Sequence, residues 1–191
     1  GAGNRWENRS MNVVSTEFYA MPGRHTDITG FDLQVSSVEA AVHVVQGLLV
    51  YDLAAKDLYG VELTAAQAGA VHERDAAALL ELARTIDPSP LDQPRHPGQR
   101  IGGRCNTYTL LTVALLRAAG IPARSRCGFG AYFVPGFYED HWVAEYWDPE
   151  KRCWTMVDAQ LDETWQRTIG MNAGIPATVG PEQFLTAGHA W

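Results

Sequence analysis

The spacing of apolar residues changes once along the chain, at Gly120-Ile121-Pro122. Before this point apolar residues recur at helical spacing, whereas after it they alternate over residues 123–132, 141–147 and 153–158. Alternation with a period of two is typical of β-strands, and glycine followed closely by proline is a strong helix stop. Because the helices come first and the strands afterwards, the sequence favours an α+β domain with antiparallel strand pairing.

Capping boxes predict where the helices of the first part begin. The pairs Ser36–Glu39 and Thr64–Gln67 each have the spacing of a helix N-terminus at which two backbone donors are satisfied reciprocally. We expect the first helix to end by Gly60 and the second to run to Ile86. A third helix is predicted to begin at Cys105 and to be buried nearly all round, since apolar residues cover several of its faces.

Composition and charge exclude several classes of function. The chain has 191 residues, 46% of them hydrophobic and 19% charged, with a net charge of -7. An acidic surface repels phosphate backbones, so nucleic acid is not an expected partner. No apolar stretch approaches the roughly 18 residues that span a bilayer, so we expect no membrane partner. We expect a cytoplasmic protein.

The three cysteines are sparse and odd in number, which indicates a reducing compartment rather than a disulfide framework. Cys127 and Cys153 fall within predicted strands, where we expect them to be small buried apolar residues. A zinc site made of the three cysteines and His141 is an alternative, but structural zinc sites usually draw their ligands from close pairs. No cofactor is expected.

Cys105 stands at the first turn of the buried helix, directly after Gly102-Gly103-Arg104. The dipole and the unpaired N–H groups of a helix N-terminus favour a thiolate, the nucleophilic form of cysteine. The same N–H groups can stabilise an oxyanion, and the glycines let the backbone turn sharply beside a substrate.

A thiolate nucleophile needs a general base, and the base needs an orienting acceptor. His141 opens one predicted strand and Asp158 ends the next, so a hairpin would bring them together if the register holds. Asp148 and Asp162 are competitors for the role of acceptor. We predict Cys105, His141 and Asp158 as a catalytic triad.

Other residues around His141 have two interpretations. Glu145 shares its strand face and either tunes the site or pairs with Arg124 or Arg126. Glu139 and Asp140 are expected to favour a charged imidazole. Aromatic residues of the preceding segment either form a lip over the acyl site or pack the loop: Tyr132, Phe133, Phe137 and Tyr138.

Four motifs together resemble the transglutaminase-like superfamily, in its bacterial type. They are residues 103–108 around the cysteine, 115–124 with its "GIPAR" ending, 141–146 around the histidine and 154–158 ending in the aspartate. The resemblance covers residues 98–162. In two respects the sequence departs from the family pattern: a tryptophan directly follows the histidine, and Ala-Gln replaces the Pro-Thr that often follows the aspartate.

The resemblance implies a papain-like fold and a cysteine-dependent acyl-transfer enzyme. Such an enzyme cleaves or exchanges an amide or thioester bond through a thioester at Cys105, with His141 as base and Asp158 as its orienting group. The substrate is a peptide or a small molecule, and water or an amine accepts the acyl group. The family also has inactive members, so a catalytically silent domain that binds a peptide or partner protein is the alternative.

The expected organisation has three parts. Residues 1–35 form an irregular arm with a strand at 13–19, and residues 36–165 form the transglutaminase-like catalytic domain. Residues 166–191 form a C-terminal extension with a short helix near Gln183. The sequence leaves open whether the chain is a fragment of a longer protein, which side chain completes the oxyanion hole, and the oligomeric state.

Overall fold

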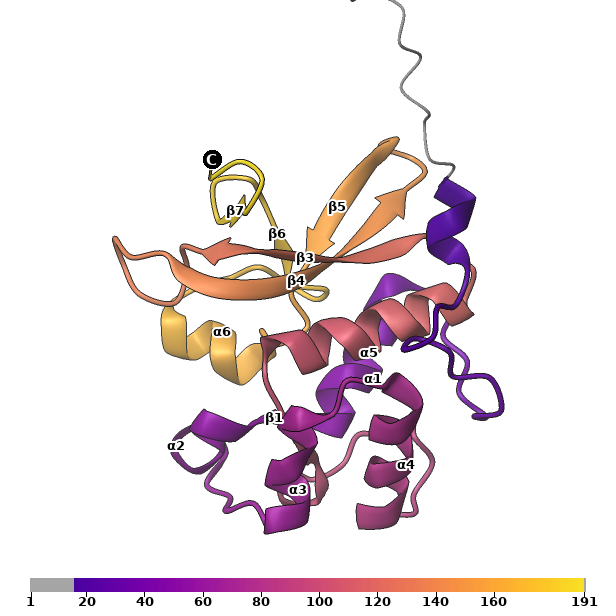
Figure 1. Cartoon of the computed structure of the whole chain (residues 1–191). Helices are drawn as coiled ribbons and strands as arrows, with labels where there is room; N and C mark the ends of the chain where they lie inside the picture. Colours follow the sequence, from indigo (N-terminus) through magenta and orange to yellow (C-terminus); the bar gives the residue numbers. More distant parts are fainter. Residues whose placement is uncertain (1–15, 191) are drawn as a thin grey trace, which may run out of the picture.

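The computed structural model of the protein describes residues 16–190 and has helices mainly in its first part and strands mainly in its second (Figure 1). The α-helices are α1 Val38–Leu48, α2 Ala55–Tyr59, α3 Ala65–Gly69, α4 Ala76–Ile86, α5 Cys105–Ala118 and α6 Glu163–Ile169. The 3-10 helices are η1 Thr16–Ala20, η2 Asp52–Ala54, η3 Ala70–His72 and η4 Pro97–Gln99. The strands are β1 Leu49–Tyr51, β2 Ile101–Gly103, β3 Ala123–Gly130, β4 Glu139–Asp148, β5 Cys153–Val157, β6 Thr178–Val179 and β7 Phe184–Thr186.

The α+β class is confirmed, and the strands after residue 122 form an antiparallel sheet in the order β6-β5-β4-β3-β7. Its central strands β3, β4 and β5 match the predicted ones to within a few residues. In Figure 1, α5 crosses the molecule between this sheet and the helices α1 to α4, whereas α6 lies under the sheet beside the N-terminal end of α5.

The first predicted helix is wrong in its extent. Its N-cap is Ser37, whose Oγ accepts from the N–H of Ala40 at 3.1 Å, rather than Ser36. The helix ends at Leu48, and Gly60 instead closes the short helix α2 in a left-handed conformation. Between them, β1 pairs in parallel with β2, a pairing that the sequence pattern does not reveal because each strand has only three residues.

The second predicted helix is interrupted. The capping box at Thr64 and Gln67 is confirmed, but the helix that it starts ends at Gly69. Asp75 then begins α4 by accepting from the N–H of Ala78 at 3.1 Å. Aspartate is favoured at a helix N-cap and disfavoured in a helix interior. The predicted helix therefore breaks before Asp75, and α4 begins after it.

The two ends of the chain differ from expectation. Of the strand predicted at 13–19, residues 16–19 lie in η1, and 13–15 lie outside the described residues. Near Gln183 a turn and β7 replace the expected helix, because the Gln183 side chain accepts from the N–H of Gly180 at 2.9 Å. The division at residues 35 and 165 stays a prediction; α6 crosses its second boundary.

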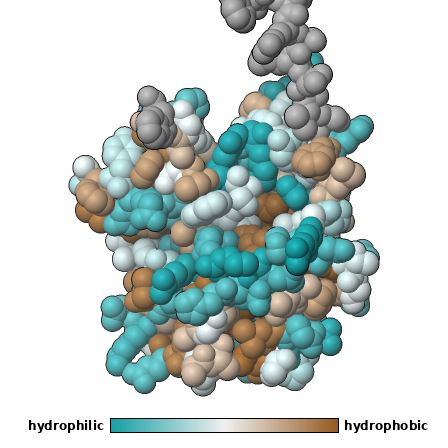
Figure 2. Space-filling model, viewed as in Figure 1, coloured by the Kyte–Doolittle hydropathy of each residue, from teal (hydrophilic) through white to brown (hydrophobic). Residues whose placement is uncertain are grey.

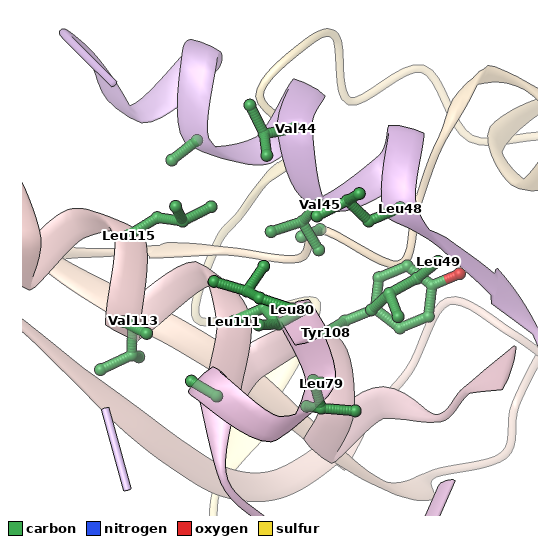
Figure 3. Close-up of a cluster of buried hydrophobic side chains, with 14 of the residues drawn as sticks. Val44, Val45, Leu48, Leu49, Leu79, Leu80, Tyr108, Leu111, Val113 and Leu115 are labelled. Atoms are coloured by element: carbon green, nitrogen blue, oxygen red, sulfur yellow. The ribbon is translucent and has the colours of Figure 1, made fainter. Parts of the chain in front are cut away.

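Two apolar clusters hold the layers together. The larger lies between α1, α4, α5 and one side of the sheet (Figure 3), and its fully buried members include Leu48, Leu80, Leu111 and Leu115. The smaller joins β4 to the segments after β5 and includes Phe184. Each such side chain contributes about 1.5–3 kcal/mol of burial free energy, so α5 is held firmly on both sides. No helix among residues 16–190 is long and apolar enough to span a bilayer.

Candidate active site

Cys105 is the first residue of α5, and close packing of β2 fixes its position. A Cβ atom on Gly102 would lie 3.0 Å from the backbone oxygen of Gln67, and one on Gly103 would lie 3.2 Å from a methyl group of Leu49. Any larger side chain would push β2 away from its neighbours. The two glycines therefore set the place at which the helix begins.

An ion pair also holds the start of α5 in place. The guanidinium of Arg104, the residue between β2 and α5, donates to both carboxylate oxygens of Asp52 at 3.1–3.2 Å. Asp52 directly follows β1, and Arg104 directly follows β2. This bidentate contact therefore links the ends of the two parallel strands through side chains, in addition to their backbone pairing.

His141 lies in β4 and is only 3% exposed. Its strand partner is Gly128 of β3, which pairs on its other side with Thr186 of β7. Three aromatic rings surround the imidazole, with centroid distances of 4.8 Å for Phe133, 5.9 Å for Tyr132 and 6.4 Å for Phe184. This packing leaves the ring little freedom to rotate.

Asp158 follows β5 directly and is 1% exposed, yet both of its oxygens have partners. Its Oδ2 lies 2.7 Å from Nε2 of His141 and accepts from the hydroxyl of Tyr132 at 2.7 Å. Its Oδ1 accepts from the N–H of Gln160 at 3.0 Å. A buried carboxylate with these donors is held in one orientation.

The charge state of His141 follows from its neighbours. Burial lowers the pKa of His141, but the charge and hydrogen bond of Asp158 and a hydrogen bond with Cys105 outweigh burial and raise it to about 10. Since Asp158 holds Nε2, Nδ1 is the nitrogen left for the thiol. The structure thus brings all three predicted residues together, and the raised pKa comes mainly from Asp158 and Cys105 rather than from Glu139 and Asp140.

The two competing aspartates lie elsewhere. Asp148 ends β4 and pairs with Lys151 at 3.0 Å. Asp162 caps α6 through the N–H of Trp165 and accepts from the hydroxyl of Tyr59 at 2.6 Å. Neither carboxylate contacts His141 in the hydrogen bonds of the described residues.

The structural interpretation of Glu145 is confirmed. Its buried Oε2 accepts from Nε of Arg124 at 2.7 Å and from Nε of Arg126 at 2.6 Å. The guanidinium of Arg124 also lies 3.9 Å from the ring centre of Trp154. This network joins the three central strands at the end opposite to His141.

The aromatic segment before β4 divides into two parts. Tyr132 and Phe133 pack around the imidazole, whereas Phe137 and Tyr138 are 59% and 54% exposed. Figure 2, viewed as in Figure 1, shows apolar surface at its left edge, where the connection between β3 and β4 projects. Packing is therefore confirmed for Tyr132 and Phe133, whereas a lip over the acyl site formed by Phe137 and Tyr138 stays a prediction.

The expectation for the other cysteines is wrong, because both Cys127 and Cys153 are exposed. Alternation shows that a strand has two faces but not which of them is covered, and Cys127 pairs with the exposed Trp142. Among residues 16–190, no group of three or more His, Cys, Asp or Glu side chains is arranged to hold a metal ion.

A helix that begins at a cysteine, packed on an antiparallel sheet that carries a histidine paired with an aspartate, defines the papain-like class of thiol domains. Residues 67–159, which include all three of these residues, match the family model of the transglutaminase-like superfamily. The match covers just under half of the chain.

Comparison with solved structures gives one crystal structure from Cytophaga hutchinsonii, of a protein described provisionally as a cysteine protease. The two sequences are 21% identical, the match covers 74% of this chain, and the TM-score is 0.37. The match spans 40% of the length of that protein. No curated protein matches the chain.

Two contributors to the site were missed by the sequence interpretation. Tyr132 was assigned to a lip or to loop packing, whereas its hydroxyl binds Asp158. Gly128 was not singled out, although a Cβ there would lie 2.7 Å from the ring of Phe184 and closer still to the backbone oxygen of Leu185. A glycine inside a predicted strand is a sign of close approach and could have drawn attention to it.

Replacing Tyr132 by phenylalanine is expected to lower the free energy of unfolding by about 1–3 kcal/mol, because the buried carboxylate of Asp158 loses a donor while the ring packing is kept. Equilibrium denaturation with urea measures this change. Tyr138→Phe removes an exposed hydroxyl from the same segment and is expected to change stability by no more than about 0.5 kcal/mol. Equal effects of the two substitutions would contradict the role of the hydrogen bond.

Proposed function

We propose that this protein is a cysteine-dependent acyl-transfer enzyme that forms a thioester at Cys105. The observation that carries the proposal is the continuous array from the Cys105 thiol through His141 to the buried Asp158. Proteins of the transglutaminase-like superfamily are generally enzymes, which supports the same conclusion. The substrate would be a peptide or a small molecule with an amide or thioester bond.

In the first half of the reaction, the Cys105 sulfur attacks the acyl carbon of the substrate. The imidazolium of His141 gives its proton to the leaving amine or thiol as the bond to the acyl carbon breaks, which leaves a thioester and a neutral imidazole. Asp158 stabilises the charged imidazole in the resting state and orients the ring during both transfers.

In the second half, His141 takes a proton from the acceptor as the acceptor attacks the thioester, and the Cys105 sulfur leaves. With water the product is a carboxylic acid, and with an amine it is a new amide. We favour hydrolysis or transfer to a small molecule, because no calcium-site motif or other mark of a protein-crosslinking enzyme occurs in the sequence.

Alkylation by iodoacetamide, resolved by peptide mass spectrometry, tests the proposal. A thiol paired with an imidazolium reacts at pH values well below the ordinary pKa of a free thiol, about 8.5. Cys105 is therefore expected to react at about pH 6 more than tenfold faster than the other cysteines. Cys127 and Cys153, both exposed, serve as internal controls in the same sample. His141→Ala is expected to remove the advantage of Cys105 at about pH 6.

If Cys105 reacts no faster than the two control cysteines at low pH, or is unaffected by His141→Ala, the thiolate–imidazolium pair does not exist. The remaining interpretation would then be a silent domain that binds a peptide or a partner protein.

A further inference from the structure

Tyr51 lies beside the candidate nucleophile although it stands far from it in the sequence. It is the last residue of β1 and pairs with Gly103 of β2, and only Arg104 separates Gly103 from Cys105. The Arg104–Asp52 ion pair closes the same gap one residue further along both strands. In Figure 1, β1 accordingly lies beneath the N-terminal end of α5.

The ring of Tyr51 is held in place, but its hydroxyl has no partner. The ring packs edge-on against Trp165 of α6 at a centroid distance of 5.4 Å, and Trp165 in turn contacts Phe133, which covers His141. Among residues 16–190, the Tyr51 hydroxyl has no hydrogen-bond partner. It is also absent from the polar atoms that are both unpaired and fully buried, so the hydroxyl is accessible. A half-buried phenol so placed is free to bind a substrate.

We propose that the Tyr51 hydroxyl donates a hydrogen bond to the carbonyl oxygen of the acyl group when Cys105 attacks it. This inference rests on the function proposed above. The reaction needs such a donor because the attack turns the carbonyl oxygen into an oxyanion, which the N–H groups at the start of α5 bind from one side. Tyr51 supplies the second donor and keeps its own proton throughout.

The chemistry of the phenol suits this role. Burial, followed by the negative charges of Cys105 and Asp52, raises the pKa of Tyr51, so that it remains a neutral donor beside a thiolate. The indole Nε1 of Trp165 also lacks a hydrogen-bond partner, but it is buried and a substrate cannot reach it. Tyr51 is therefore the accessible donor on this side of the thiol.

Two reactions of Cys105 separate oxyanion binding from general reactivity. Acylation by p-nitrophenyl acetate forms an oxyanion, whereas alkylation by iodoacetamide is a displacement at carbon that forms none. Tyr51→Phe keeps the ring against Trp165 and removes only the hydroxyl. We expect this variant to slow the p-nitrophenol burst at least about tenfold and to leave the alkylation rate within about twofold. Loss of one oxyanion donor typically lowers turnover by about 10²–10³-fold.

The control variant is Tyr146→Phe, which removes a phenolic hydroxyl near the end of β4 that lies away from His141. Thermal unfolding of both variants shows whether they are folded. An unchanged burst in folded Tyr51→Phe overturns the inference and leaves the proposed function standing, and so does an equal slowing of both reactions. If the wild-type protein is alkylated rapidly at Cys105 but shows no burst, the proposed function and this inference fall together.

Discussion

Replacing Cys105 by alanine is expected to abolish the formation of an acyl-enzyme and to lower turnover of any amide or thioester substrate by about 10⁴-fold or more, as loss of the nucleophile does in other triads. No other thiol can take its place, because Cys127 and Cys153 are exposed on strands and do not contact His141 in the described structure. The burst of p-nitrophenol from p-nitrophenyl acetate and the mass of the acylated protein measure the effect.

The matched controls are Cys127→Ala and Cys153→Ala, which remove exposed thiols and are expected to leave the burst unchanged. A burst that persists in Cys105→Ala and disappears in one of the controls would assign the acyl group to the wrong cysteine and refute the mechanism.

Replacing Asp158 by alanine is expected to lower turnover by about 10⁴-fold, as found for the orienting aspartate of other triads. It is also expected to change the pH dependence. In the wild-type protein His141 keeps its proton until the pH rises through about 10, because its pKa is raised. Without the carboxylate the pKa of His141 falls, so the alkaline limb of the pH–rate profile should move to lower pH.

Asp158→Asn serves as the conservative comparison, since an amide oxygen can still accept from His141 and Tyr132 but carries no charge. We expect its turnover to lie between those of the wild-type protein and Asp158→Ala, with the alkaline limb displaced as in the alanine variant. A limb that stays at the wild-type position in both variants would show that Asp158 does not set the protonation of His141.

The sequence could predict the central sheet because its strands alternate clearly and are bounded by strong turn residues. The same bounds explain why the proximity of His141 and Asp158 could be predicted: a hairpin between two adjacent strands leaves few registers. The place of Cys105 depends instead on the packing of α5 against the sheet. The catalytic role of the three residues stays a prediction.

Other parts of the fold could not be predicted from local pattern. The pairings of β1 with β2 and of β7 with β3 join short segments that are distant in the chain, and too few residues are involved to show a periodicity. For that reason Tyr51, whose position depends on the first pairing, had no visible connection with the thiol. The exposure of Cys127 was missed because it depends on which face of β3 is covered.

The order in which the chain is synthesised gives the pairing of β7 a further consequence. The ring of Phe184 closes the pocket of His141, and Gly128 leaves the space in which β7 lies. A growing chain folds from its N-terminus, so Cys105 and its helix can form while residues 178–186 are still inside the ribosome. The imidazole would then lack part of its covering until these residues have left the ribosome.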